Sequence, residues 1–347
     1  MSNLINKETE LVELNNVELN FHKSALLQKT QELNALHNIN LKVNKGEIVV
    51  VVGESGSGKT TLANVIAGLL KPTTGAYRFK GKEINSMSKE EKLEYRNNIQ
   101  VIQQDSYAAL NPMRTMIKSL GDPMVIKKYA NKANLKEKVN EFLKIVDLTP
   151  TEHFIHKYPH QMSGGQRQRA LIARALSMNP QLILADEPVS MIDVSLRVSI
   201  LNLLAHLNEE RNIAILYITH DLATARYVGK KGRIAVMYLG EIVETGNLQE
   251  VLANPRHPYL QALLTAVPIP DPRLSRMRKE LGLNGTDLPD IANMPSGCRF
   301  HTRCMYATDI CKTTCPDHVV RGSSTVACHL VDDLPKFELF TKAVGGD

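Results

Sequence analysis

The 347-residue chain is 43% hydrophobic and 22% charged, values typical of an ordinary globular protein, and it carries a formal net charge of +6. It has no run of the roughly 18 apolar residues that a membrane-spanning helix needs, and its mild positive charge forms no basic block, so we expect no nucleic-acid partner. The segment from Met1 to Lys7 lacks the apolar core of a secretory signal, so we expect the chain to work in the cytoplasm.

The first 46 residues alternate short apolar runs with polar residues, which predicts antiparallel strands. These runs cover residues 11–14, 17–21 and 36–43. Phe21 or His22 could stack on a nucleotide base. An aromatic residue near a strand end is as often simply packed against its neighbours, and both interpretations stay open.

A glycine-rich loop lies between the apolar run Ile48–Val52, which predicts a buried strand, and a helical pattern over Thr60–Leu70. The loop satisfies the phosphate-binding pattern G-x-x-x-x-G-K-S/T with Gly53, Glu54, Ser55, Gly56, Ser57, Gly58, Lys59 and Thr60. In that geometry backbone N–H groups bind phosphate oxygens, Lys59 reaches the β- and γ-phosphates, and the Thr60 hydroxyl binds Mg²⁺. We predict an ATP site here, with Thr61 as its last residue.

The next segments predict a strand over Tyr77–Ile84, a helix opened by the capping box Ser88–Glu91, and an apolar strand that runs into Gln104. Residues 111–160 are helical in pattern, with one apolar stripe formed by Leu135, Val139, Phe142, Leu143 and Val146. We expect an inserted helical subdomain at about residues 105–180.

Three further motifs follow in an alternation of strands and helices. Ser163 and two glycines open a helix, which gives a second anion site without a lysine of its own. The apolar strand Leu182–Glu187 ends in two carboxylates, and the strand Ile213–Thr219 precedes His220. This alternation indicates an α/β fold with a largely parallel sheet, in which ligands gather at the carboxyl ends of strands.

Beyond Pro255 proline residues punctuate a predicted helix, Tyr259–Ala266, and a linker. The five cysteines follow, at Cys298, Cys304, Cys311, Cys315 and Cys328. In a reducing compartment, clustered thiols indicate a metal or iron–sulfur site rather than disulfides, although a zinc ribbon fits poorly because no C-x₂-C pair is present. The alternative is five ordinary free thiols. Further possible ligands are His301, His318 and His329.

In this order, the phosphate loop, Ser163–Gln166, the strand end Asp186-Glu187 and His220 resemble the ATP-binding subunit of an ABC transporter. The sequence His257-Pro258-Tyr259 and the cysteine-bearing tail resemble the dipeptide/oligopeptide importer branch. Within that branch, Asp186–Ser190 resembles the second, F-type, of the two paired ATPase subunits. The resemblance covers nearly the whole chain.

The resemblance implies an α/β fold: a P-loop NTPase core of the ABC ATPase type, with an antiparallel β subdomain, an inserted helical subdomain and a C-terminal cysteine-bearing extension. The ATPase domain would span residues 1–254. The extension would span residues 255–347, with its cysteine cluster at 298–328.

The resemblance also assigns roles to the motifs. Asp186 would hold Mg²⁺ through water, with Thr60 and Gln104 as further Mg²⁺ contacts, Glu187 would polarise the attacking water, and His220 would contact the γ-phosphate. The signature residues that would complete the ATP site of the opposite subunit are Ser163, Gly164, Gly165 and Gln166.

Three positions near the signature concern the contact between subunits. Asp193 matches the aspartate that links the two ATP sites of a dimer. Met162 departs from the family's usual residue without an expected effect. Met191 and Ile192 replace a smaller pair in the family, and we expect them to alter the packing of the interface rather than the chemistry.

In some relatives the tail cluster is a four-iron, four-sulfur centre (4Fe-4S). By that match the ligands would be Cys298, Cys304, Cys311 and Cys328, with Cys315 as the spare thiol. The expected cofactors are therefore ATP, Mg²⁺ and this cluster.

The implied function is an ATPase that powers a membrane importer of di- or oligopeptides from the cytoplasmic face of the membrane. Its expected partners are a second ATPase subunit in a heterodimer, two transmembrane permeases and an extracytoplasmic solute-binding protein. Alternatives are the same transporter class importing an oligosaccharide or a nickel chelate, a non-transport ABC ATPase acting on DNA or ribosomes, and a redox module with a subordinate ATPase.

Overall fold

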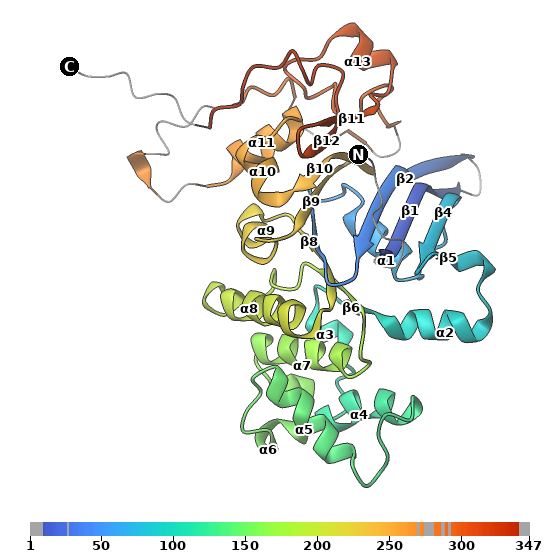
Figure 1. The fold of residues 1–347 in the computed structure, drawn as a ribbon, viewed down its shortest axis with the longest axis vertical. Helices are drawn as coiled ribbons and strands as arrows, with labels where there is room; N and C mark the ends of the chain where they lie inside the picture. Colours follow the sequence, from blue (N-terminus) through green and yellow to red (C-terminus); the bar gives the residue numbers. More distant parts are fainter. Residues whose placement is uncertain are drawn as a thin grey trace, which may run out of the picture.

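The computed structural model describes residues 10–25, 28–268, 271–273, 281–285, 289–290 and 293–339. Around a central sheet, Figure 1 shows a group of helices at one end, a smaller sheet at one side and the C-terminal segment at the other end. Within these ranges no helix is long and apolar enough to cross a membrane.

The smaller sheet is antiparallel throughout, as predicted from the alternating N-terminal pattern. Its strands, in spatial order, are β2 (Gln28–Asn44), β1 (Glu10–Ala25), β4 (Thr74–Phe79) and β5 (Lys82–Glu83). β1 and β2 form one long hairpin where three separate runs were expected. The polar residues do not end β1 because a shift of register lets the strand continue, with Asn16 at a φ of 48°.

The predicted single strand over Tyr77–Ile84 is wrong. Lys80 and Gly81 both have positive φ, 50° and 77°, so the chain turns after β4. The remainder becomes the short β5 and a 3₁₀ turn, η1 (Ile84–Ser86).

The larger sheet is parallel at its centre and antiparallel at one edge. Its strands, in spatial order, are β11 (His318–Arg321), β12 (Ser324–Ala327), β10 (Glu241–Asn247), β9 (Arg233–Tyr238), β3 (Ile48–Val52), β8 (Ala214–Thr219), β7 (Leu182–Asp186) and β6 (Ile99–Ile102). The five strands from β9 to β6 run parallel. The predicted parallel α/β sheet is therefore confirmed, and β3 lies inside it with every residue buried.

Some helices cover the two faces of this sheet, and others lie beyond its ends. They are α1 (Lys59–Ile66), α2 (Lys89–Asn98), α3 (Ser106–Ala109), α4 (Met116–Ile126), α5 (Leu135–Ile145), α6 (Glu152–Ile155), η2 (Pro159–Gln161), α7 (Gly164–Leu176), α8 (Val194–Arg211), α9 (Leu222–Val228), α10 (Leu248–Ala253), α11 (Pro258–Ala266) and α13 (Asp309–Thr313). Alternate residues of β3 face two apolar clusters. Val49 and Val51 join the cluster that contains α1 and the small sheet, whereas Val50 and Val52 join the cluster that contains α7 to α11.

Helices α4, α5 and α6 lie together below the sheet in Figure 1. The predicted stripe on α5 is apolar and inward: Val139, Leu143 and Val146 are buried, and Leu135 and Phe142 pack against the same cluster. The stripe thus does what its spacing predicts, because residues three and four apart share one helix face.

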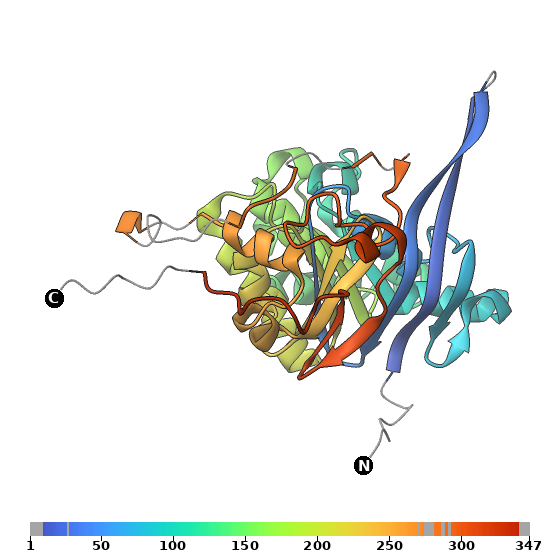
Figure 2. The ribbon, with the colours of Figure 1, turned by 90° about the horizontal axis from the view of Figure 1, so that it is seen from above.

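The C-terminal extension is joined to the core through the larger sheet. The predicted helix after Pro255 is α11, and further along the chain the hairpin of β11 and β12 adds to the edge of the sheet, where Thr325 of β12 pairs with Thr245 of β10. In Figure 2 this segment lies across the strands β9 and β10, while the β1–β2 hairpin projects away from the body.

Candidate active site

The glycine-rich loop connects the buried strand β3 to the start of α1 at the centre of the parallel sheet. Gly58 has a φ of 97° and precedes α1. Glycine has no side chain that could cap the helix, so no capping side chain bonds to the first N–H groups of α1. A Cβ on Gly53 would lie 2.1 Å from the carbonyl oxygen of Met237. The loop therefore depends on glycine at both ends, and its backbone donors are available to an anion.

Lys59 is buried within this loop. Its ammonium donates to the carbonyl oxygens of Gly53 (2.8 Å) and Glu54 (2.7 Å) and to the hydroxyl of Ser57 (3.3 Å). Burial lowers the pKa of Lys59, while the carboxylates of Glu187 and Asp186 act in the opposite direction. A cation thus lies where the loop would receive phosphate.

A pocket of about 780 Å³ opens above the loop. The predicted site residues that line it are Gly53, Glu54, Ser55, Gly56, Gly58, Lys59, Thr60, Thr61, Phe21, Gln104, Glu187 and His220. Phe21 is largely exposed at the margin of the pocket, and the side chain of His22 lies outside the described part of the structure. Residues of the loop and residues far along the chain therefore share one cavity large enough for a nucleotide.

The end of β7 places two carboxylates beside the loop. The Asp186 carboxyl accepts a hydrogen bond from Thr60. Burial raises the pKa of Asp186, and this effect outweighs the hydrogen bond and the charge of Lys59, which both lower it. The hydroxyl of Thr60, the carboxylate of Asp186 and the amide of Gln104 are oxygen donors of the kind that Mg²⁺ prefers. The residues present therefore fit Mg²⁺.

Glu187 is held from both sides at the carboxyl ends of three adjacent parallel strands. Its Oε1 lies 2.8 Å from Nδ1 of His220, which follows β8, and its Oε2 accepts from Nε2 of Gln104, which follows β6, at 3.3 Å. The Glu187 backbone has a φ of 45° and donates its N–H to Ile218. A non-glycine residue at positive φ is uncommon, and here it aims the carboxylate into the pocket.

The signature residues lie elsewhere. Ser163 caps α7, accepting from the N–H of Gln166 while the Gln166 side chain accepts from the N–H of Ser163. A Cβ on Gly165 would lie 3.1 Å from Leu196, and one on Gly164 would lie 3.8 Å from the Met191 carbonyl. The signature therefore borders the segment that holds the exposed Asp193, and it does not line the pocket above this chain's own phosphate loop.

The predicted 4Fe-4S centre is wrong. In the part of the chain that the structure describes, no group of three or more His, Cys, Asp or Glu side chains is arranged to hold a metal ion. Burial raises the pKa of the Cys298 thiol to about 12 and of the Cys328 thiol to about 11. Cys304 packs in the apolar core, and the Cys315 thiol donates to the carbonyl of Gly297 at 3.3 Å.

One ring nitrogen of each alternative histidine ligand is hydrogen-bonded to a backbone carbonyl group. His301 bonds with Cys298, His318 with Ile242, and His329 with Thr314, at 2.9, 2.7 and 2.8 Å. The cysteines are thus free thiols, which was the alternative left open by their spacing.

Sequence reasoning missed one wall of the pocket. Leu263, Ala266 and Met294 of the C-terminal extension line it, as do Asn34 and Leu239. The sequence signal near this wall was His257-Pro258-Tyr259, which supported the family resemblance. It did not indicate that α11 lies beside a nucleotide pocket.

The fold and the pocket were compared with known proteins. A family model described as ABC transporter matches residues 36–190, and one described as Oligopeptide/dipeptide transporter, C-terminal region, matches residues 243–311. A solved structure of the ATP-binding cassette MJ0796, dimeric and bound to ADP and Pi, is 34% identical with a TM-score of 0.60, covering 69% of this chain and 99% of that one. The cbiO1 structure from Clostridium perfringens is 28% identical with the same TM-score, covering 71% and 92%. The fold and the site are those of an ABC-transporter ATPase.

Two curated relatives show which family of ABC-transporter ATPases the chain belongs to. The oligopeptide transport ATP-binding protein AppF of Bacillus subtilis is 44% identical over 330 residues, 94% of this chain and 98% of that protein. The oligopeptide transport ATP-binding protein OppF of Salmonella typhimurium is 40% identical over 341 residues, 96% and 100%. The chain belongs to this family of oligopeptide-transport ATP-binding subunits, as its motifs predicted. It is an ATPase coupled to transport, and membership implies permease partners and a dimer of ATPase chains.

Proposed function

We propose that this chain hydrolyses ATP at the cytoplasmic face of a membrane to drive the import of di- or oligopeptides. One observation carries the proposal: Glu187 is held between Gln104 and His220 at the margin of the phosphate-loop pocket.

The phosphate loop binds the nucleotide in this proposal. The N–H groups at the start of α1 and the ammonium of Lys59 bind the phosphates of ATP, and Phe21 is placed at the margin to contact the base. Thr60, Asp186 and Gln104 would hold Mg²⁺, which when bound would supply positive charge beside the phosphates.

Glu187 orients the water that attacks the γ-phosphate. Its carboxylate accepts a hydrogen bond from Gln104 and shares one with His220, so its rotation is restricted before substrate arrives. A pre-oriented base avoids reorganisation at the moment of reaction. His220 is largely exposed toward the pocket, which leaves its ring free to contact the γ-phosphate.

Two chains complete each other's sites. Support comes from the separation between the signature at Ser163 and the pocket of the same chain, and from an apolar patch beside the signature. This patch consists of Met191, Val194 and Val198, and all three are exposed. Exposed apolar residues next to Asp193 fit a face that a second ATPase subunit covers. We propose that this subunit is a different chain, which makes the assembly a heterodimer.

The permeases dock near α3 and α4 in this proposal. A groove of about 560 Å³ is lined there by residues that include Arg114, Ile126 and Arg174, and Met113 and Ile126 are 84% and 77% exposed. The lining of the groove includes Gln100 and Ala109, which lie on either side of Gln104 in the chain, so a permease helix seated in it would be linked to the catalytic site through a short segment. An extracytoplasmic binding protein would deliver the solute. The limits of the ATPase domain, 1–254, and of the extension, 255–347, are part of the proposal as well.

Co-purification from gently solubilised native membranes tests the function. We expect the tagged chain to recover two permeases and a second ATPase, and the reconstituted assembly to hydrolyse ATP faster when a peptide-loaded binding protein is added. Stimulation by an oligosaccharide or a nickel chelate in place of peptides would identify the alternative solutes. Recovery of ribosomes or DNA-repair proteins without a membrane partner would contradict transport.

A further inference from the structure

Glu54, the second residue of the phosphate loop, is held by the C-terminal extension. Arg303 forms two hydrogen bonds with its carboxylate, from Nη1 to Oε2 at 2.7 Å and from Nη2 to Oε1 at 3.1 Å. The backbone N–H of Glu54 donates to the hydroxyl of Tyr259 on α11 at 2.8 Å. The extension therefore fixes this residue through both its side chain and its backbone.

The anchor is buried. The Arg303 side chain is 7% exposed, and its guanidinium lies over the rings of Tyr238 and Phe300, 5.8 and 5.9 Å from their centroids. Tyr259 packs against both rings at 4.6 and 5.5 Å. The Glu54 side chain is 29% exposed, so only the arginine side of the pair is buried. A fork-shaped ion pair is more directional than a pair joined by one hydrogen bond, so this contact restricts the loop.

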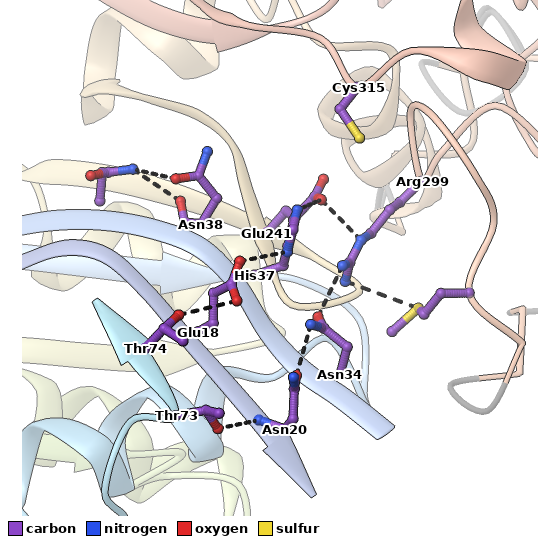
Figure 3. A network of polar contacts seen from close by, with 12 residues as sticks. Glu18, Asn20, Asn34, His37, Asn38, Thr73, Thr74, Glu241, Arg299 and Cys315 are labelled. Atoms are coloured by element: carbon purple, nitrogen blue, oxygen red, sulfur yellow. Dashed lines mark hydrogen bonds and ion pairs between the residues drawn. The ribbon is translucent and has the colours of Figure 1, made fainter. Parts of the chain in front are cut away.

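A second arginine of the same turn holds another part of the pocket wall. Figure 3 shows Arg299 extending from the C-terminal segment to Glu241 and to Asn34 of β2. Its Nε lies 2.9 Å from Glu241, one Nη donates to Asn34 at 2.9 Å, and the other donates to the Leu239 carbonyl. Asn34 and Leu239 line the pocket. Arg303 thus binds the phosphate loop, and Arg299, four positions earlier, binds a neighbouring wall of the pocket.

The position of Glu54 matters for phosphate binding because its carbonyl group also holds the loop together. That carbonyl oxygen accepts one hydrogen bond from the ammonium of Lys59, at 2.7 Å, and another from the N–H of Ser57, at 3.2 Å. A displacement of Glu54 would therefore move the lysine that meets the phosphates.

We propose that Arg303 is a positioning residue for the phosphate loop: through Glu54 it sets the place of Lys59, so the extension controls the affinity of the chain for ATP. The proposal rests on the function proposed above, since it takes ATP as the occupant of the pocket. Arg303 touches the loop and not the reacting atoms, so its loss changes binding more than turnover.

The test compares Arg303→Ala and Arg303→Lys with the unchanged chain, using a fluorescent ATP analogue for Kd and steady-state hydrolysis for KM and kcat in the assembled transporter. We expect Arg303→Ala to raise Kd and KM about two- to thirtyfold, with a smaller change in kcat. Arg303→Lys keeps the charge but loses the fork, so an intermediate Kd is expected. The control is Arg321→Ala, which removes an exposed ion pair with Asp332 elsewhere in the extension and should leave Kd unchanged.

A double-mutant cycle with Glu54→Ala separates positioning from general damage. If Arg303 acts through Glu54, the double variant binds ATP no more weakly than the weaker single variant. Additive effects, or a Kd for a folded Arg303→Ala chain within twofold of the unchanged chain, would overturn the proposal. Should Arg303→Ala fail to fold, the Kd of Arg303→Lys decides in the same way. Failure of the unchanged chain to bind the analogue at all would instead contradict the proposed function.

Discussion

His220 and Glu187 share a hydrogen bond of 2.8 Å between Nδ1 and Oε1, across the ends of the adjacent parallel strands β8 and β7. These residues are 33 positions apart in the chain, and the parallel pairing of the strands brings them together. The bond orients a carboxylate whose backbone is already turned into an uncommon conformation, at a φ of 45°. In the mechanism proposed above, this geometry would orient the base before substrate binds.

Glu187→Gln should retain ATP binding and lose turnover. The amide keeps the volume of the side chain but cannot act as a base, so we expect the ATPase rate to fall about 10²- to 10⁴-fold. Phosphate release and analogue binding, measured side by side, check this. Glu209→Gln is the matched control because Glu209 forms only an exposed ion pair with Lys231. An unchanged rate for Glu187→Gln would remove Glu187 from the mechanism.

Gly53→Ala should disrupt the phosphate loop. Its methyl group would lie 2.1 Å from the Met237 carbonyl oxygen, a backbone atom that cannot rotate away, so we expect a loss of about 3 kcal/mol in unfolding free energy together with weaker ATP binding. Gly81→Ala serves for comparison: it faces open space at a φ of 77°, so only the backbone cost of about 1 kcal/mol applies. Denaturant titration measures both. Equal losses in the two variants would show that the close contact at Gly53 relaxes.

Acid should destabilise the protein through His257. This residue is fully buried at the start of α11, where Nδ1 accepts the N–H of Tyr259, and burial lowers the pKa of His257 to about 3. Between pH 6.5 and 3 the unfolded chain binds a proton that the folded chain does not, so stability falls as pH falls, by up to about 1.4 kcal/mol per pH unit.

His257→Asn separates this effect from other acid-sensitive groups. Asparagine can still accept at the helix start but does not titrate. We expect the unfolding free energy of the unchanged chain minus that of the variant to decrease as pH is lowered through this range. A difference that is constant with pH would show that His257 is not the cause.

Met191→Glu should weaken the dimer of ATPase subunits. The change places a charge in the apolar patch beside the signature, and burying an unpaired charge is costly. In a Glu187→Gln background with ATP, we expect the dissociation constant of the dimer to rise at least about tenfold, measured by analytical ultracentrifugation. Val320→Glu, at an exposed position in the extension, should have no such effect. A comparable loss for both variants would place the interface elsewhere.

The thiols should differ in reactivity under native conditions. Cys315 is exposed, whereas Cys304 and Cys311 are buried, so a bulky thiol reagent should label Cys315 first. Mass spectrometry of briefly labelled protein identifies the modified positions. Early labelling of Cys304 would show that the C-terminal segment opens more readily than its packing indicates.

The central strand, the phosphate loop and the first helix could be predicted from sequence because every signal there is local. The apolar run of β3, the glycines and the helical spacing after Thr60 adjoin one another. The structure forms each of these elements, although α1 ends at Ile66 and not at the predicted Leu70. The capping box at Ser88 was predicted for the same reason, since it joins residues three positions apart. At Ser163 only the start of a helix was predicted, and the structure adds a capping box with Gln166.

The contact of Arg303 with Glu54 joins residues 249 positions apart, so no local sequence pattern predicts it. The cysteine spacing was misleading for a related reason. Spacing along the chain shows which soft ligands are available, but it does not show whether their side chains adopt a metal-binding arrangement. The error at Lys80 had another cause: Gly81 is a local turn signal that the predicted strand ran through, and both Lys80 and Gly81 adopt positive φ in the turn.

The pairing of β12 with β10 affects where the chain can be cut. A fragment ending at residue 254 would keep every motif of the ATPase but would leave β10 without the partner that satisfies its outer backbone groups. An uncovered strand edge is a template for pairing with other chains, so such a fragment would be prone to aggregate. Expression of this cassette for biochemistry should therefore retain the hairpin near the far end of the chain.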